Sequence, residues 1–214
     1  MADIKYGLYY IDREYLDKLS EADNHVPKHD YEDDGRSRKY YCGPVMDEYD
    51  VKYFVPVSSQ TEKNSMVIPG SAYNGVTEYY GIPLPDASGH NKGGGNLDFR
   101  FMIPCVNDEL LTPMTPTSDF AKTQAAFCMK NEKIICRIAS DTYQNIQSGD
   151  YDFLNNSSIN QENVLDKMWE YEDILESRRN MAEKRAKMIV RASAADNITP
   201  NNSDLSSNYE DEKT

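Results

Sequence analysis

The sequence has 214 residues, of which 39% are hydrophobic and 28% are charged, a composition that suits one domain with a modest core. Its 36 Asp and Glu outnumber its 23 Lys and Arg, and the net charge of -13 argues against nucleic-acid binding unless cations are concentrated in one groove. No apolar run reaches the roughly 20 residues that span a bilayer, and no signal-peptide pattern is present. We therefore expect a cytoplasmic protein with no membrane partner.

Residues 4–11 are aromatic and β-branched, which predicts a strand. Asp12 is placed to cap a short helix in which Tyr15 begins an apolar stripe. Residues 24–38 are acidic, contain Pro and Gly, and lack periodicity, so they predict an exposed loop.

Residues 39–46 and 51–57 predict two strands joined by a turn at 47–50, which is a β-hairpin. Most of residues 58–95 is expected to be loop. The three glycines at 93–95 lack the Lys and Ser or Thr of a phosphate-binding loop, so they are expected to form a flexible hairpin loop instead.

Residues 96–104 alternate and predict one continuous strand. The apolar side chains fall on one face of it: Leu97, Phe99, Phe101 and Ile103. Asp98 and Arg100 fall on the opposite face, which we expect to meet solvent or a ligand.

Ser118 is placed to cap a long helical segment that ends near Gly149, with a break near Asn131. Its expected apolar stripe consists of Phe120, Phe127, Ile134, Ile135 and Ile138. A last helix begins near Val164 and runs to about Ala194. The predicted organisation is a single domain over residues 1–195, followed by an acidic tail at 196–214 that is expected to be disordered.

Metal and cofactor signals are weak. The four cysteines are widely spaced among apolar neighbours and are interpreted as reduced core thiols: Cys42, Cys105, Cys128 and Cys136. His25 and His29 are four residues apart, but Pro27 breaks the helix that would align them. We expect neither a metal site nor a cofactor.

Hydroxyl and cationic side chains gather around the predicted hairpin. Lys39 precedes its first strand, and a polar run follows its second strand: Ser58, Ser59, Thr61 and Lys63. Taken alone, this pattern is more typical of ordinary turn chemistry than of a catalytic site.

Several segments resemble the ToxN/AbiQ/CptN family of type III toxin-antitoxin endoribonucleases. They are LYYI at 8–11 with YL at 15–16, NHVP at 24–27, YFVPVSS at 53–59, LDFRFMIP at 97–104 and ASDT at 139–142. They occur in the family's order and spacing over about residues 6–172, which leaves 173–195 as a helical extension.

The resemblance implies an α+β fold: a compact, strongly twisted, mostly antiparallel sheet flanked by helices, similar to the Kid/MazF toxins. It also implies metal-independent RNA cleavage, in which the 2′-hydroxyl attacks the adjacent phosphorus and leaves a 2′,3′-cyclic phosphate. Ser59 matches the family's essential serine and Ser58 a neighbouring Thr or Ser position. Lys39 and Tyr15 match a charge-stabilising lysine and a tyrosine that positions RNA or transfers a proton. Relatives often continue with Pro-Lys where this chain has Gln60-Thr61, so the lysine's role falls to Thr61 or Lys63.

The implied partner is a small pseudoknot RNA antitoxin in a closed ring of alternating toxin and RNA units, with cellular or phage RNA as substrate. The expected RNA contacts are Tyr31, Arg36, Arg38, Ser140, Asp141 and Thr142. Six further cations lie beyond the matched region: Arg178, Arg179, Lys184, Arg185, Lys187 and Arg191. They indicate an added RNA contact or self-association helix, or equally a solvated helix face paired with the acidic tail.

Two other functions stay open on sequence. One is an RNA-binding module of the same fold without turnover, which the missing Pro-Lys permits. The other, indicated by net charge alone, is an acidic interaction protein or nucleic-acid mimic.

Overall fold

The computed structural model describes residues 4–27, 39–58, 66–90 and 93–196, with side chains described as far as 190 at the C-terminal end. The chain divides into two units, Met1–Glu172 and Asp173–Thr214, and the sheet belongs to the first. Helix α5 (Gln161–Asp196) contributes residues to both units. Among the described residues, no helix is long and apolar enough to cross a membrane.

The described part of the first unit contains one sheet of seven strands in the order β4-β5-β3-β2-β1-β7, with β6 also pairing β3. The strands are β1 (Gly7–Ile11), β2 (Tyr41–Glu48), β3 (Val51–Ser58), β4 (Gly81–Pro83), β5 (Asn96–Asp98), β6 (Ile103–Cys105) and β7 (Leu111–Pro113). All of these pairings are antiparallel. The expected α+β fold with an antiparallel sheet and flanking helices is confirmed.

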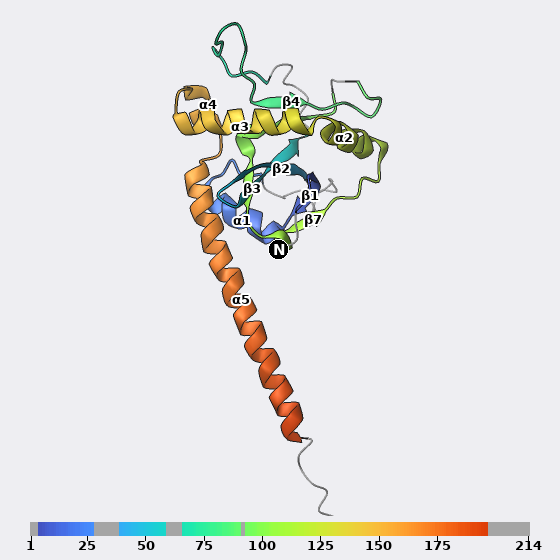
Figure 1. Ribbon diagram of the computed structural model, residues 1–214, viewed down its shortest axis with the longest axis vertical. Coiled ribbons are helices and arrows are strands. Elements are labelled where there is room, and N and C mark those ends of the chain that lie inside the picture. The colour runs from blue at the N-terminus through green and yellow to red at the C-terminus, as the bar shows by residue number, and fades with distance from the viewer. Residues whose placement is uncertain (1–3, 28–38, 59–65, 91–92, 197–214) are drawn as a thin grey trace, which may run out of the picture. The chain divides into compact units, whose positions relative to one another are not determined.

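The helices of the first unit are α1 (Arg13–Ala22), α2 (Asp119–Lys130), α3 (Glu132–Ser148), α4 (Asp152–Ser157) and the start of α5. Figure 1 shows α2 and α3 following one another across one side of the sheet, where they pack against β1 and β2. The predicted caps form, because the Asp12 carboxylate accepts from the Tyr15 amide and the Ser118 hydroxyl from the Ala121 amide. The predicted break at Asn131 is confirmed.

The predicted apolar stripe of α2 and α3 is wrong in part. Phe120 is 36% exposed and Ile134 is 48% exposed, although Ile135 is fully buried. The residues that face the core are Ala121, Gln124 and Cys128 on α2, and Ile135, Ala139, Thr142 and Tyr143 on α3. Small and polar side chains therefore occupy much of this interface, which an apolar pattern does not indicate.

The predicted hairpin is confirmed as β2 and β3. Its two turn residues, Tyr49 and Asp50, have φ of 52° and 66°, the left-handed values that a tight two-residue hairpin turn of the right twist requires. The register of this pair shifts between Cys42 and Met46, which marks a bulge in β2.

The single strand predicted for residues 96–104 is wrong, because a 3₁₀ turn at Phe99–Phe101 divides it into β5 and β6. Both parts pair with β3, but the register shifts by three residues between them, the length of the turn. Asp98 and Arg100 are consequently buried instead of facing solvent or ligand. Their side chains are 6% and 5% exposed and form an ion pair, with Arg100 Nη2 2.5 Å and Nε 2.8 Å from the carboxylate oxygens.

The glycine run at 93–95 leads into β5, which pairs antiparallel with β4, so the predicted hairpin is confirmed, but Gly94 is tightly packed and not flexible. The Gly94 amide donates to Leu84 O at 3.2 Å, and the Leu84 amide donates to Gly95 O at 2.9 Å. A Cβ atom at Gly94 would lie 1.7 Å from Pro85 O, so glycine is needed there for close backbone packing. Gly94 is therefore a tightly packed point of support just before β5.

The four cysteines contain no disulfide: Cys42, Cys105 and Cys128 are buried, and Cys136 is half-buried. Burial raises the pKa of the Cys105 thiol to about 12. These positions agree with the interpretation of the cysteines as core thiols.

Candidate functional site

Lys39 and Ser58 come together at the end of the β2–β3 hairpin. Tyr41 pairs with Pro56, and the Val57 amide donates to Tyr40 O at 2.9 Å, so the ladder continues beyond the last assigned pair. Continuing this register places Lys39 opposite Ser58. Directly opposite residues of antiparallel strands project from the same face of the sheet. Both residues are half-buried, which leaves part of each side chain accessible.

Asn96 borders Ser58 on the other side, because the first residue of β5 pairs with the last residue of β3. The Asn96 side chain is 5% exposed. Three polar side chains therefore lie next to one another across adjacent segments: the ammonium of Lys39, the hydroxyl of Ser58 and the amide of Asn96. Sequence reasoning missed Asn96, since its pattern marked only the start of a strand.

Burial lowers the pKa of Lys39 from its ordinary value. A cation in a partly dehydrated position interacts with a nearby phosphate more strongly than a solvated surface lysine does. The arrangement can therefore stabilise negative charge that develops next to Ser58.

Six of the predicted site residues lie outside the described residues: Ser59, Thr61, Lys63, Tyr31, Arg36 and Arg38. Both segments that contain them are covalently continuous with the Lys39–Ser58 pair. Residues 28–38 lead directly into Lys39, and residues 59–65 follow directly on Ser58. Their predicted roles stay predictions.

Tyr15 is located in the core and not at this end of the hairpin. Its side chain is fully buried, its hydroxyl donates to Pro104 O at 2.5 Å, and its ring centroid is 5.4 Å from that of Tyr171. Burial raises its pKa well above the ordinary value. This placement favours packing over the predicted contact with RNA or proton transfer.

The predicted RNA contacts Ser140, Asp141 and Thr142 lie on α3 and differ in exposure. Thr142 is fully buried, and its hydroxyl donates to Tyr79 O at 3.3 Å. Ser140 is half-buried and Asp141 is exposed. Thr142 thus supports the fold in this structure, while the Asp141 carboxylate would repel a phosphate.

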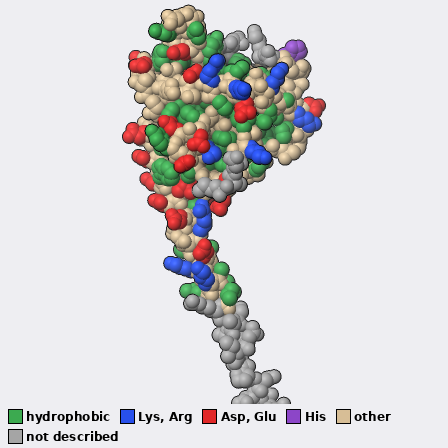
Figure 2. Space-filling model, viewed as in Figure 1, with side chains coloured by type: hydrophobic (Ala, Val, Ile, Leu, Met, Phe, Trp, Pro, Cys, Tyr) green, Lys and Arg blue, Asp and Glu red, His purple; other side chains and the backbone are tan. Residues whose placement is uncertain are grey.

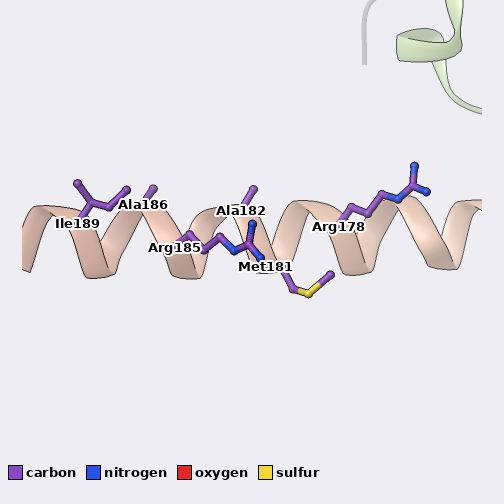
Figure 3. A pocket seen from close by; sticks show the side chains of 6 residues that line it. All are labelled: Arg178, Met181, Ala182, Arg185, Ala186 and Ile189. Carbon is purple, nitrogen blue, oxygen red and sulfur yellow. The ribbon is translucent and has the colours of Figure 1, made fainter.

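The basic stretch lies on α5 within the second unit, where Figure 2 shows Lys and Arg side chains on the helix surface. A shallow hollow on this helix is lined by Arg178, Met181, Ala182, Arg185, Ala186 and Ile189 (Figure 3). Met181 is 51% exposed and Ile189 is 66% exposed. This face of α5 therefore mixes guanidinium groups with exposed apolar side chains.

Within residues 4–27, 39–58, 66–90 and 93–196, no group of three or more His, Cys, Asp or Glu side chains lies close enough together to hold a metal ion.

A family model described as "Toxin ToxN, type III toxin-antitoxin system" matches residues 7–187. This match confirms the resemblance found in the sequence and extends beyond the predicted limit of residue 172. No functionally curated protein matches the chain.

Solved structures share the fold at low sequence identity. One structure comes from a bacterial type III toxin-antitoxin system in which a non-coding RNA pseudoknot selectively inhibits the toxin. This structure has 22% identity to the chain and a TM-score of 0.62, with 79% of this chain and 99% of that chain covered. The lactococcal anti-phage endoribonuclease AbiQ has 18% identity and a TM-score of 0.60 at the same coverage. A third structure comes from a bacterial antiviral system that a processed non-coding RNA regulates. It has 18% identity and a TM-score of 0.55, with 70% of this chain and 95% of that chain covered.

Proposed function

The chain belongs to the ToxN family of type III toxin-antitoxin toxins, and from this we propose that it is a metal-independent endoribonuclease toxin whose active site lies at the Lys39–Ser58 end of the hairpin. The observation that carries the proposal is the register that places Lys39 opposite Ser58, directly before Ser59. Ser59 follows a strand end that is fixed on both sides, by Tyr40 and by Asn96.

The reaction is an internal transesterification of RNA. The substrate's 2′-oxygen forms a bond to the adjacent phosphorus while the bond from phosphorus to the 5′-oxygen breaks, and a 2′,3′-cyclic phosphate remains. The 2′-hydroxyl gives its proton to solvent water, and the departing 5′-oxygen receives one from a donor side chain that regains it from solvent, so the net proton count is unchanged. Such a step needs in-line alignment, stabilisation of the charged phosphorane and a proton donor.

Each residue has a defined part in this proposal. The Lys39 ammonium stabilises the phosphorane oxygens, and the Ser59 hydroxyl orients the 2′-hydroxyl or the phosphate. Ser58 supplies a second hydroxyl, and Thr61 or Lys63 protonates the 5′-oxygen. Tyr15 stays a proposed contributor only if its hydroxyl leaves Pro104, which its burial opposes.

The proposed regulator is a small pseudoknot RNA that the toxin processes and that inhibits it in a closed ring of alternating protein and RNA units. Two of the solved relatives concern toxins or antiviral systems that a non-coding RNA inhibits or regulates, which supports an RNA partner. Tyr31, Arg36 and Arg38 would contribute stacking and phosphate contacts. The proposed location is the cytoplasm and the proposed substrate is cellular or phage RNA.

An RNA-binding module without turnover is the second candidate, because Gln60-Thr61 replaces the Pro-Lys that often follows the serine in this family. The two candidates predict the same RNA affinity but different chemistry. Only the endoribonuclease converts bound RNA to shorter products.

Cleavage of a long RNA by purified protein in EDTA, after copurified RNA has been removed, separates the candidates. Wild-type protein and Ser59→Ala are compared with Ser88→Ala, which alters an exposed loop serine in the described structure. Cleavage by wild type and Ser88→Ala, with loss in Ser59→Ala and retained RNA binding, supports the proposal. Binding without cleavage by wild type favours the module.

A further inference from the structure

Gln124 is a buried amide in the middle of α2. It is 1% exposed and lies on the core-facing side of the helix, between Ala121 and Cys128. Placing a polar side chain there costs free energy unless its hydrogen-bonding groups find partners.

Both ends of the Gln124 amide have partners. The Tyr40 hydroxyl donates to Gln124 Oε1, and Gln124 Nε2 donates to Gly94 O. The orientation of the amide follows from chemistry, because the Gly94 carbonyl is only an acceptor and must face the NH₂ group. The remaining oxygen must then face the Tyr40 hydroxyl. Burial raises the pKa of Tyr40 to about 12, so this hydroxyl stays a donor into more alkaline solution than an ordinary tyrosine.

These two partners lead into the two strands that flank β3. Tyr40 precedes β2 and accepts from the Val57 amide, whereas Gly94 precedes β5, whose Asn96 pairs with Ser58. In the sheet, β3 lies between β5 and β2. Gln124 therefore joins both neighbours of β3 at the end where Lys39 and Ser58 meet.

We propose that Gln124 is a positioning residue, which holds Lys39 and Asn96 at fixed distances on either side of Ser58. The inference rests on the proposed function, since it assigns this clamp to the ribonuclease site. Gln124 acts through the side-chain hydroxyl of Tyr40 and the backbone carbonyl of Gly94.

Both ends of the clamp are held by further contacts. Gly94 packs so closely on Pro85 that no Cβ atom fits, and its amide donates to Leu84 O. Tyr40 is fixed in turn by the Val57 amide at 2.9 Å. Loss of the Gln124 amide removes the link between these two segments, and a displacement of about 1 Å at a reacting group can reduce a rate about 100-fold.

The test compares Gln124→Met and Tyr40→Phe with Gln161→Met in the full-length chain. Gln161 is the control because it is 2% exposed and its Nε2 also donates to a backbone carbonyl, Met102 O at 3.2 Å, while its buried Oε1 has no hydrogen-bond partner among the described residues and so links no second segment. Single-turnover cleavage at saturating protein, RNA affinity and hydrogen exchange of the Val57 amide are measured well below each unfolding midpoint.

We expect Gln124→Met and Tyr40→Phe each to slow single-turnover cleavage at least 10-fold with RNA affinity within about 3-fold of wild type, and to speed exchange of the Val57 amide. Combining them should add little to either single loss, because they break the same clamp. Gln161→Met should lower the unfolding midpoint while cleavage stays within 3-fold of wild type.

A purely structural Gln124 would give the opposite pattern. Gln124→Met would then resemble Gln161→Met, with a lower midpoint, an unchanged rate and unchanged Val57 exchange, and the inference would be overturned. Failure of the proposed function is a separate result, namely no cleavage by wild-type protein. In that case faster Val57 exchange in Gln124→Met would still establish the clamp, and unchanged exchange would refute it.

Discussion

The buried pair of Asp98 and Arg100 gives the sharpest stability prediction. In Arg100→Met the Asp98 carboxylate stays 6% exposed and loses both guanidinium contacts, at 2.5 and 2.8 Å. The guanidinium also lies 4.4 Å from the Tyr80 ring centroid and donates to Ser157 Oγ at 3.1 Å, so further contacts are lost.

The expected cost follows from the burial of both partners. Breaking a buried ion pair on one side typically destabilises a protein by about 3–5 kcal/mol, because the remaining charge is left uncompensated. Domain stabilities are about 5–15 kcal/mol, so this variant should lose a large share of its total stability. The double variant Asp98→Asn with Arg100→Met has no buried charge and should lose less than Arg100→Met alone.

Urea unfolding followed by circular dichroism measures these differences. With a slope of about 2 kcal/mol per M, Arg100→Met should lower the midpoint by about 2 M. Lys122→Met is the surface control, because it breaks an ion pair to Asp119 whose side chains are 60% and 90% exposed, and should leave the midpoint nearly unchanged. A shift below about 0.5 M for Arg100→Met, or a double variant less stable than Arg100→Met, would refute the reasoning.

Three further outcomes are expected. Burial lowers the pKa of Lys39, so its ammonium loses its proton at a lower pH than that of an ordinary lysine. The pH at which the cleavage rate declines on the alkaline side should therefore be higher in Lys39→Arg than in wild type. An unchanged pH profile would contradict a role for this cation. Tyr15→Phe loses the hydrogen bond to Pro104 O. Its free energy of unfolding in urea should fall by about 1–3 kcal/mol, while its cleavage rate stays unchanged. A folded Tyr15→Phe variant that cleaves RNA about 100-fold more slowly would show that packing is not the main role of Tyr15. Gly94→Ala places a methyl group 1.7 Å from Pro85 O and should destabilise by about 1–3 kcal/mol, whereas wild-type stability would show that the loop is not tightly packed.

Local patterns predicted much of the fold because the decisive interactions are close in sequence. The β2–β3 hairpin and the break at Asn131 follow from turn and capping residues, and both are confirmed. The short strand β7 went unpredicted, since its three residues form a strand only by pairing with β1.

The failures come from side chains whose partners are set by tertiary structure. Alternation placed Asp98 and Arg100 on an exposed face, but the 3₁₀ turn at Phe99–Phe101 interrupts the strand and buries them together. The Asp98 carboxylate also accepts from the Arg100 amide at 3.3 Å, which stabilises that turn. An alternating pattern of apolar and polar residues does not reveal a three-residue 3₁₀ turn inserted into a strand.

The candidate site was predictable only in part. Lys39 and Ser58 were both identified, and the hairpin register explains why they meet. Asn96 and Gln124 were missed because their positions depend on pairing between distant segments. For Gln124 a signal existed, since it lies three residues after Ala121 and four before Cys128 on what proves to be the buried side of α2.

The most direct test of the central claim is analysis of the RNA ends that the stripped, full-length protein produces in EDTA. Mass spectrometry of the products should show 2′,3′-cyclic phosphates opposite 5′-hydroxyl ends, and these products should be absent with Ser59→Ala and present with Lys130→Met, a variant of an exposed lysine on α2. Products with 5′-phosphate ends, or cleavage that appears only when a divalent metal is added, would contradict the account.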